Sequence, residues 1–563
     1  MTNHLTDEQR EIGRANAHAA IGGLETGPRG GYPTRRDFLI AAGAASAGLG
    51  MLYFGYGVLG EGVKPVRTVV IGTGNEGCDA MIRQHNRNYI DIIGYCDARP
   101  YNQQRALDFF SRQDLGQYSK EDIANLKKYD TIAEILDEPD VEAIINALPL
   151  WLHAPVSIDA MKKGKHVFCE KLMAHNIMES KQMCRVARET NKVLGIGHQR
   201  HYSALYDNAN ALVASGALGE IRHIRASWHR NNGQRVIAKN SDGSLKIDES
   251  TGEFVYERDD DGNYLYFDSW KPPYMDGDRE INLAKIAYKS LDGKTYSYDN
   301  HDELVRWRLY DKTGAGLMAE LGSHQLDACS IFLGKKHPVA VAGFGGTYYY
   351  EDNREVDDHV FVNFEFPNKI DDQGLPADDG RVVVSYSSIT TNAFEKYGEM
   401  LMGTYGTMMV EQEFDIYLYK ENDRNRPGSG GGPATAVKIE KAGGQAILDT
   451  SPSAIGPTQA AALGSMASGD GYPPSRGYRE ELEHFAYCIR HGNESNFYEV
   501  IGTEDELKYL PRCRGEIALA DAVIALTSNL AMRRKQRIEF DPAWFDYTSN
   551  ENPETSTRLV RRT

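Results

Sequence analysis

The fold is decided by residues 68–77, which read TVVIGTGNEG. The first four residues form a strand-like apolar run, and a G-x-G-x-x-G pattern follows at once. Such a pattern is typical of a strand that turns tightly into a helix. Gly72 permits the turn, Gly74 lets a pyrophosphate approach the backbone, and Gly77 lets the helix pack closely on the strand. This stretch therefore predicts the first βα unit of a dinucleotide-binding domain.

The surroundings of this turn support nucleotide binding. A helix beginning near Asn75 and Glu76 would offer backbone N–H groups and the positive end of its dipole to phosphates. Asp97 lies twenty residues beyond Gly77, at the end of the next apolar run, where it can accept hydrogen bonds from ribose hydroxyls. A carboxylate there repels a 2′-phosphate and favours NAD. Arg99 could pair with that phosphate, so NADP remains the alternative.

Residues 66–200 alternate short apolar runs with segments of helical length, including 155–163 and 178–190. Continuous apolar strands separated by helices indicate a parallel sheet that is covered on both faces. We therefore expect an α/β Rossmann domain with a doubly wound parallel sheet. Its expected strands are residues 68–71, 90–96, 143–147, 166–169 and 193–196.

Residues 201–545 show a different pattern and predict a second α/β domain. Apolar and polar residues alternate in several runs, which favours an open, mostly antiparallel sheet with one solvated face. A long polar insertion, 231–310, interrupts this domain, and its aromatic residues fit sugar stacking and simple packing equally well. The expected strands are residues 223–228, 360–366, 381–387, 401–409 and 416–419.

Composition narrows the class of protein. The chain has 563 residues, of which 41% are hydrophobic and 25% charged, as in a soluble globular protein of two or three domains. The formal net charge of -17 argues against nonspecific nucleic-acid binding. Seven scattered cysteines without a CxxC pair indicate neither a metal site nor a disulfide framework.

Both ends of the chain read as non-globular. Residues 1–33 predict a disordered tail, and residues 546–563 a second tail. Between residues 34 and 62, Arg35 and Arg36 precede an uncharged segment, 38–60, which resembles a twin-arginine (Tat) export signal. We therefore expect export to the periplasm through the Tat machinery, and an uncleaved membrane anchor at 38–60 remains an alternative.

Two further strand ends point to the crevice where ligands bind in open α/β sheets. The first carries a turn with Pro149, Trp151 and His153, and the second ends in Glu170 and Lys171. A desolvated lysine beside a bound nicotinamide has a lowered pKa, which suits acid–base work. A surface ion pair is the competing interpretation of the Glu-Lys pair.

These motifs together resemble the Gfo/Idh/MocA (glucose–fructose oxidoreductase and inositol dehydrogenase) family. The resemblance rests on the glycine pattern, Asp97, the Leu-Pro-x-x-x-His turn, GKHVFCEK and VLGIGHQRHY. It implies an NAD(P)-dependent enzyme that acts on sugars, cyclitols or related polyols, and a homo-oligomer that is a dimer or a tetramer. Lys171 matches the lysine of the family's Glu-Lys-Pro motif, although Leu172 replaces the proline.

A second part of the expected site lies in residues 314–327, which resemble the family stretch with an acid and a histidine four positions apart. Here these residues are Glu320 and His324, which would share one helix face. The resemblance implies that a substrate hydroxyl lies between Lys171 and His324. Either residue could take its proton while the hydride passes to the nicotinamide, and Glu320 or Asp327 could orient the histidine.

Arg200 and Tyr202 are weaker candidates for binding sugar hydroxyls, and a salt bridge at the domain hinge explains Arg200 equally well. The sequence thus predicts an NAD(P)-dependent oxidoreductase acting on CH–OH groups. An exported enzyme has no NAD pool with which to exchange, so a tightly bound, recycled cofactor is expected. An NAD-dependent glycosidase that works by transient oxidation and elimination is the alternative, and a non-catalytic sugar-binding relative is a third.

Overall fold

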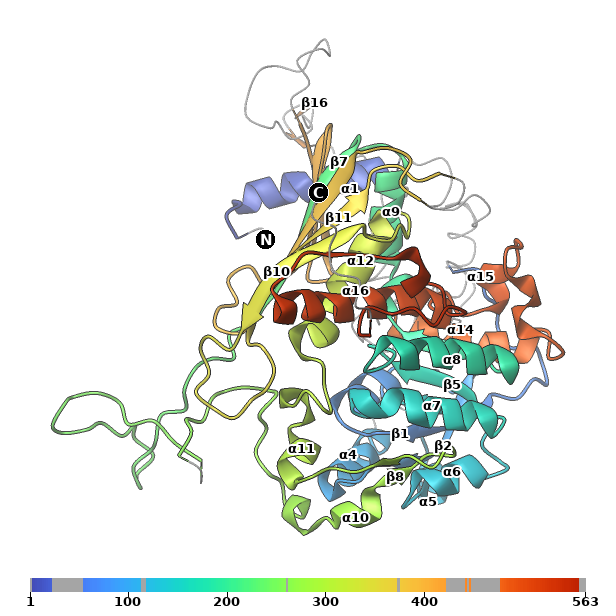
Figure 1. The fold of residues 1–563 in the computed structure, drawn as a ribbon, viewed down its shortest axis with the longest axis vertical. Helices are drawn as coiled ribbons and strands as arrows, with labels where there is room; N and C mark the ends of the chain where they lie inside the picture. The colour runs from blue at the N-terminus through green and yellow to red at the C-terminus, as the bar shows by residue number, and fades with distance from the viewer. Residues whose placement is uncertain are drawn as a thin grey trace.

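The computed structural model places two packed α/β domains, with the nucleotide-type sheet below and the larger sheet above in Figure 1. All seven cysteines are buried and unpaired. The structure describes residues 3–22, 54–112, 118–259, 262–371, 375–421, 441–442, 445–446 and 476–555.

The first domain is a six-stranded, wholly parallel sheet in the order β3-β2-β1-β4-β5-β6. This is the strand order of the dinucleotide-binding fold, and it confirms the predicted fold class. The strands are β1 (Val66–Ile71), β2 (Ile90–Cys96), β3 (Lys127–Lys128), β4 (Ala143–Asn146), β5 (His166–Glu170) and β6 (Leu194–Gly197).

Helices cover both faces of this sheet because its strands are apolar on both sides. Two of them, α14 (Tyr478–His491) and α16 (Gly515–Arg534), come from the end of the chain. They bury Phe485 and Leu519 in the same core as Val69. The domain expected to end at residue 200 is therefore completed by residues from the expected second domain. The remaining helices here are η1 (Glu76–Ile82), α4 (Pro100–Phe110), α5 (Lys120–Asn125), α6 (Ile132–Asp137), η2 (Leu150–Leu152), α7 (His153–Lys162) and α8 (Ile177–Glu189).

The second domain is an eight-stranded sheet in the order β15-β14-β13-β7-β12-β11-β10-β18. Only the β7–β12 pairing is parallel among the described strands of this sheet, so it is mostly antiparallel, as expected. The expected strand 401–409 is two strands, because Thr404 and Tyr405 form the turn of a hairpin. The strands are β7 (Ile221–His229), β10 (Ala340–Gly346), β11 (His359–Pro367), β12 (Arg381–Ile389), β13 (Tyr397–Gly403), β14 (Gly406–Glu411), β15 (Asp415–Lys420) and β18 (Ile538–Glu539).

Helices pack on this sheet, and one of them, α16, also contacts β6 of the first domain. The others are α9 (Ala204–Ala214), η6 (Met318–Gly322) and α12 (Ser323–Phe332), and η3 (Gln199–Tyr202) packs on α9 and α12. Among the helices that the structure describes, only α16 is long and apolar enough to cross a bilayer. Since 72% of its apolar window is buried in the protein, α16 is a core helix joining both domains.

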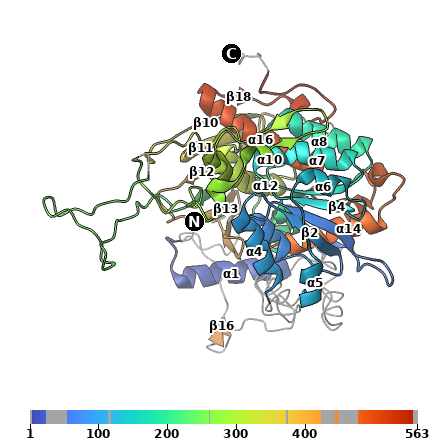
Figure 2. The same ribbon diagram turned by 90° about the horizontal axis from the view of Figure 1, so that it is seen from below.

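The insertion 231–310 has two parts. Paired segments between Arg235 and Tyr266 form an arm that projects from the body in both views (Figures 1 and 2). The later part lies against the nucleotide domain through η4 (Asp278–Glu280), where Asp278 is bound by Arg99, and through Tyr288, whose hydroxyl donates to Asp159 at 2.6 Å. Its other elements are α10 (Leu283–Ile286), β8 (Tyr288–Lys289), β9 (Thr295–Tyr296), α11 (His301–Val305) and η5 (Trp307–Leu309).

The predicted disorder of residues 1–33 is wrong for helix α1 (Asp7–Gly22), which packs on β15 and α9. Arg14 pairs with Asp415 at 3.0 Å, and the Asn16 side chain donates to the Leu418 carbonyl at 2.9 Å. These partners lie some 400 positions away in the chain, so the composition of the tail could not reveal them. The twin arginines and residues up to 53 lie outside the described residues.

The expected tail from residue 546 also begins as ordered structure. The Lys181 ammonium donates to the backbone carbonyls of Ser549 and Glu551, and Arg185 donates to that of Tyr547. Two cations of α8 thus hold the chain between Tyr547 and Glu551, and the structure describes it as far as Thr555.

Candidate active site

In the glycine turn after β1, the fold requires two of the glycines, and the third leaves open space for a ligand. Gly72 has a φ of +90°, and a Cβ there would collide with the Ala147 carbonyl. A Cβ at Gly77 would collide with the Gly72 carbonyl. A Cβ at Gly74, by contrast, would meet no protein atom within 4 Å. The protein itself requires the outer two glycines, whereas the open space at Gly74 fits a pyrophosphate approaching the backbone.

Asp97 stands at the end of β2 beside this turn. Its carboxylate accepts hydrogen bonds from the Thr73 N–H at 2.8 Å, the Arg99 N–H at 2.9 Å and the Asn102 amide at 3.1 Å. Burial raises the pKa of Asp97 despite these bonds. The bonds fix the carboxylate at the strand end, where the ribose of a dinucleotide is expected.

The guanidinium of Arg99 is turned away from Asp97. It forms two bonds to Asp278 of the insertion, Nε–Oδ1 at 2.9 Å and Nη2–Oδ2 at 2.6 Å. The side chain of Asp278 is fully buried. Arg99 therefore already holds an anionic partner from within the chain.

The helix that follows the glycine turn is η1, a π-helix, and π-helical turns are frequent at functional sites. Asn75 and Glu76 lie exposed at its start, and Asn75 binds Arg105. Glu170 at the end of β5 is buried, and this burial raises its pKa to about 8. Glu170 also accepts the Lys171 N–H at 3.1 Å, which shapes the strand end.

Lys171 links the two domains at the carboxyl edge of the parallel sheet. Its ammonium donates a 2.7 Å hydrogen bond to the backbone carbonyl of Glu320. That carbonyl belongs to η6, a π-helix that leads directly into α12. The expected α-helical spacing between Glu320 and His324 is thus interrupted. The peptide between Lys171 and Leu172 is cis.

The Glu320 carboxylate is turned to a partner that the sequence did not reveal. Arg308 donates to it from Nε at 2.7 Å. Burial raises the pKa of Glu320, but Arg308 and Lys171 outweigh it, so the net pKa lies below the usual range. Glu320 is therefore an ionised residue that positions the wall of the site.

His324 is the candidate proton acceptor. It is 8% exposed, and its Nδ1 has no hydrogen-bond partner among the described residues. Its ring packs on Trp228 of β7 with centroids 5.3 Å apart. Burial, together with the charges of Lys171 and Arg200, holds the pKa of His324 well below its usual range. His324 is therefore neutral at physiological pH, and the expected bond from Glu320 or Asp327 is not formed.

His153 is a clamp on the neighbouring backbone. Its Nδ1 lies 2.8 Å from the Leu172 carbonyl, and its Nε2 lies 2.7 Å from the Leu148 carbonyl. Both nitrogens are thus engaged between the Pro149 turn and the residue after Lys171. Trp151 packs edge-on against Tyr298 of the insertion.

Arg200 and Tyr202 are buried and use their polar atoms on the protein itself. Arg200 binds Glu399 at 2.8 Å, Glu413 at 2.9 Å and the His324 carbonyl at 2.6 Å. The Tyr202 hydroxyl lies 2.8 Å from His484 Nδ1. The salt-bridge interpretation of Arg200 holds, and Arg200 supports α12 from beneath.

Asp327 belongs to a separate buried cluster. It accepts bonds from His201 and Lys335, each at 2.8 Å. His198 and Asp521 complete the cluster, and among the described residues His198, Asp327 and Asp521 alone bring three potential metal-ligand atoms within 4.8 Å of one another. Because the ammonium of Lys335 already binds Asp327, a cation of the chain itself occupies this cluster.

Three residues near the site, Trp228, Arg230 and Arg308, were not predicted from the sequence. Alternation along an extended strand puts Trp228 and Arg230 on one face, and this signal was available at the end of the expected strand 223–228. Arg308 carried no signal, because its partner Glu320 lies beyond a loop, within η6.

Two family models match the chain. Residues 66–198 match the oxidoreductase family with an NAD-binding Rossmann fold, and residues 292–407 match the GFO/IDH/MocA C-terminal domain. The first match ends at His198, immediately before η3, and the second covers β10 to β13 as well as His324. The matched segments contain Lys171 and His324, respectively.

Among curated proteins, the chain is similar to a glycosyl hydrolase family 109 protein of Shewanella baltica and to an alpha-N-acetylgalactosaminidase of Shewanella oneidensis. Each is 26% identical over 215 residues, which is 34% of this chain and 45% of the relative. The match thus spans less than half the length of these relatives.

Among solved structures, the chain is similar to an oxidoreductase domain protein from Kribbella flavida, with a TM-score of 0.52 and 17% identity over 85% of this chain and all of the other. It is also similar to the WlbA dehydrogenase from Bordetella pertussis, solved with NADH and UDP-GlcNAcA. There the TM-score is 0.50 and the identity 14%, over 85% of this chain and 98% of the other. These likenesses concern the fold alone.

Proposed function

We propose that the chain transfers a hydride between NAD and a hydroxyl-bearing carbon of a sugar, cyclitol or related polyol, because its segments match the models of both Gfo/Idh/MocA domains. One observation carries this proposal. The Lys171 ammonium crosses from the end of β5 to the Glu320 carbonyl of η6, four residues before His324. A cation and a neutral imidazole thus approach each other at the edge where open α/β sheets bind ligands.

The residues present fit a dinucleotide. The open backbone at Gly74 and the start of η1 would take the pyrophosphate, and Asp97 would take the ribose hydroxyls. The bound nicotinamide would supply the hydride acceptor. Support for NAD over NADP comes from Arg99, whose guanidinium is already paired with Asp278. A 2′-phosphate would have to compete with that carboxylate.

In the proposed oxidation, His324 accepts the hydroxyl proton, since its neutral ring has a free nitrogen lone pair at physiological pH. Lys171 donates a hydrogen bond to the substrate oxygen and stabilises the negative charge that develops there. The carbinol C–H bond breaks, and its electron pair leaves as hydride while the C–O bond becomes a carbonyl. The reverse reaction returns the proton from His324.

We also propose export through the twin-arginine route, on the strength of Arg35 and Arg36 before the uncharged segment 38–60. An exported enzyme would carry its cofactor in the folded state and recycle it at the site. Protein purified from the periplasm would then contain NAD, measurable by mass spectrometry after denaturation. Exported protein that contains no nucleotide would contradict the proposal that the enzyme carries its cofactor in the folded state.

The test of the chemistry uses holoprotein, a panel of sugars and cyclitols, and absorbance of the reduced nicotinamide. Lys171→Met and His324→Gln should each lower the rate of cofactor reduction by about 10² or more. Lys163→Met is the matched control, because Lys163 is an exposed lysine paired with Asp137. Unchanged rates in both site variants would refute the proposed mechanism.

A second candidate function is supported by the two Shewanella relatives, whose names describe glycosidases. Transient oxidation at the same site would acidify a neighbouring C–H bond and permit elimination of an aglycone. Holoprotein incubated with nitrophenyl glycosides and no added NAD separates the two. Release of nitrophenol supports the glycosidase, whereas one oxidised and one reduced sugar in equal amounts support the oxidoreductase. A non-catalytic sugar-binding protein would bind sugars and yield neither product.

A further inference from the structure

Arg230 is a cation without a carboxylate partner at the edge of the candidate site. It follows β7, and its backbone N–H donates to the Ile389 carbonyl at 2.9 Å, so the chain is still extended there. Residues two apart on an extended strand share a face, so Arg230 lies on the face of Trp228. Trp228 packs on His324. The Arg230 side chain therefore belongs to the same wall as the proposed proton acceptor.

Arg230 is partly buried, and two nitrogens of its guanidinium are buried without a hydrogen bond. Its Nε and Nη2 have no hydrogen-bond partner within the described part of the chain. It lies over the ring of Trp270, an insertion residue, with its central carbon 4.9 Å from the centroid. Burial lowers the pKa of Arg230, and the nearby charge of Arg308 acts in the same direction. A buried guanidinium that lacks an anion is costly, so a partner is expected to arrive with a ligand.

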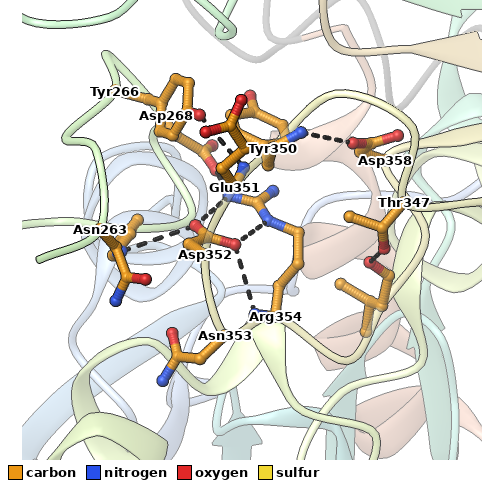
Figure 3. A network of polar contacts seen from close by, with 12 residues as sticks. Asn263, Tyr266, Asp268, Thr347, Tyr350, Glu351, Asp352, Asn353, Arg354 and Asp358 are labelled. Carbon is orange, nitrogen blue, oxygen red and sulfur yellow. Dashed lines mark hydrogen bonds and ion pairs between the residues drawn. The ribbon is translucent and has the colours of Figure 1, made fainter. Parts of the chain in front are cut away.

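The acidic groups nearby are already committed. Asp268 lies closest to Arg230 in electrostatic influence, but it accepts the Arg354 guanidinium at 3.0 Å and the Trp270 N–H at 3.0 Å. Figure 3 shows Arg354 held between Asp268 and Asp352, with Tyr350 beside it. This network ties the first part of the insertion to residues 347–358, and no hydrogen bond joins Asp268 to Arg230 within the described residues.

The other cations beside Arg230 also have partners. Arg308 is paired with Glu320 at 2.7 Å, and Lys271 with Asp259 at 3.1 Å. Within the described part of this wall, Arg230 is the arginine whose positive charge is not paired with a carboxylate. Its two orphaned donors, Nε and Nη2, are the pair that binds a carboxylate through two parallel hydrogen bonds.

We propose that the substrate carries a carboxylate, as a sugar acid does, and that Arg230 binds it while Lys171 and His324 address the hydroxyl to be oxidised. This inference rests on the proposed hydride-transfer function and adds the class of substrate. A guanidinium fork can bind a carboxylate or a phosphate through two hydrogen bonds, so the experiment includes a sugar phosphate to separate the two anions. Trp270 gives the insertion a role, because its ring holds the guanidinium in place.

The experiment compares matched pairs of ligands on holoprotein: glucose with glucuronate, galactose with galacturonate and mannose with mannuronate. Glucose 6-phosphate is added as a second kind of anion. Binding is measured by tryptophan fluorescence and cofactor reduction by absorbance. At least one sugar acid should half-saturate the protein at a concentration roughly tenfold or more below that of its neutral partner.

The ratio compared is the half-saturating concentration of the neutral sugar divided by that of its acid. Arg230→Met should bring this ratio close to one. Arg230→Lys should keep part of the preference, because the lysine retains the charge without the planar fork. Arg222→Met is the matched control, because Arg222 is an exposed arginine of the same strand paired with Glu220. If Arg230→Met fails to fold, as a thermal melt would show, the lysine variant carries the test.

The outcomes separate the two proposals. A ratio near one in the wild type, a ratio unchanged in the Arg230 variants, or a preference for the sugar phosphate overturns the carboxylate inference. Cofactor reduction by neutral sugars alone would then leave the hydride-transfer function standing. Selective binding of sugar acids through Arg230 without cofactor reduction by any sugar would instead refute the function and leave only the carboxylate binding by Arg230 standing.

Discussion

Replacing Asp278 with asparagine should change the choice of cofactor. Asp278 lies in the insertion, and its fully buried carboxylate holds the Arg99 guanidinium through two bonds. Asparagine keeps the volume but removes the charge that neutralises Arg99. The freed guanidinium then lies two residues beyond Asp97, where a 2′-phosphate of NADP would be placed. We expect the protein to gain affinity for NADP.

The magnitude follows from the contacts. Removing one partner of a buried ion pair costs about 3–5 kcal/mol of stability. Arg99 is 14% exposed, so its charge is partly hydrated and the lower end, about 3 kcal/mol, applies. A charge-assisted hydrogen bond to a phosphate contributes about 1.5–3 kcal/mol, which corresponds to a ten- to hundredfold shift in the ratio of the two dissociation constants.

The assay is a titration of nucleotide-free protein with NADH and NADPH, followed by the fluorescence of the bound nicotinamide. Asp276→Asn is the matched control, because Asp276 is an exposed aspartate two residues away. Urea unfolding measures the stability change independently. A variant that loses stability while the ratio of its dissociation constants for NADH and NADPH stays at the wild-type value would refute the assignment of Asp278 as a determinant of cofactor choice.

Three further outcomes follow from the structure. Gly74→Ala should weaken NAD binding about tenfold with a stability change within ~0.5 kcal/mol, whereas Gly72→Ala should cost about 1–3 kcal/mol in urea unfolding because of its positive φ and its collision with a carbonyl. Log(kcat/KM) for oxidation should stay level as pH falls through about 6.5, the ordinary pKa of histidine, because burial and nearby cations keep His324 neutral below that pH; an acid limb centred at 6.5 or higher would contradict this. Arg200→Met should lower the free energy of unfolding by about 3–5 kcal/mol, since it strands two buried glutamates, and a loss below 1 kcal/mol would speak against that ion network.

The central strands of the first domain could be predicted to within two residues, because strands that are buried on both faces read as unbroken apolar runs. β3 is two exposed lysines at the edge of the sheet and carries no such signal. The hairpin of β13 and β14 was hidden because the turn at Thr404 and Tyr405 interrupts the apolar run only briefly. Apolar runs in the sequence thus predict a strand more clearly when that strand buries more apolar surface.

Motifs could name Lys171 and His324, and the two residues lie near enough for the charge of Lys171 to lower the pKa of His324. Their roles in catalysis stay a prediction. For Arg200 the sequence left a sugar ligand and a salt bridge equally open, because its partners Glu399 and Glu413 lie about 200 residues away and no local pattern indicates a buried ion pair of that range. Arg230 was overlooked for the converse reason, since an arginine without a partner looks like any surface arginine in a sequence.

Helix α1 gives the N-terminal end of the chain a structural task. It covers β15, an edge strand, and Asn16 occupies the Leu418 carbonyl that another strand could otherwise use. Any cut between residues 23 and 53 would separate α1 from the body, leaving only non-covalent contacts to retain it. If export includes such a cut, loss of α1 would expose the edge strand β15 to pairing with a strand of another chain. Proteolysis and self-association would then be coupled through this one helix.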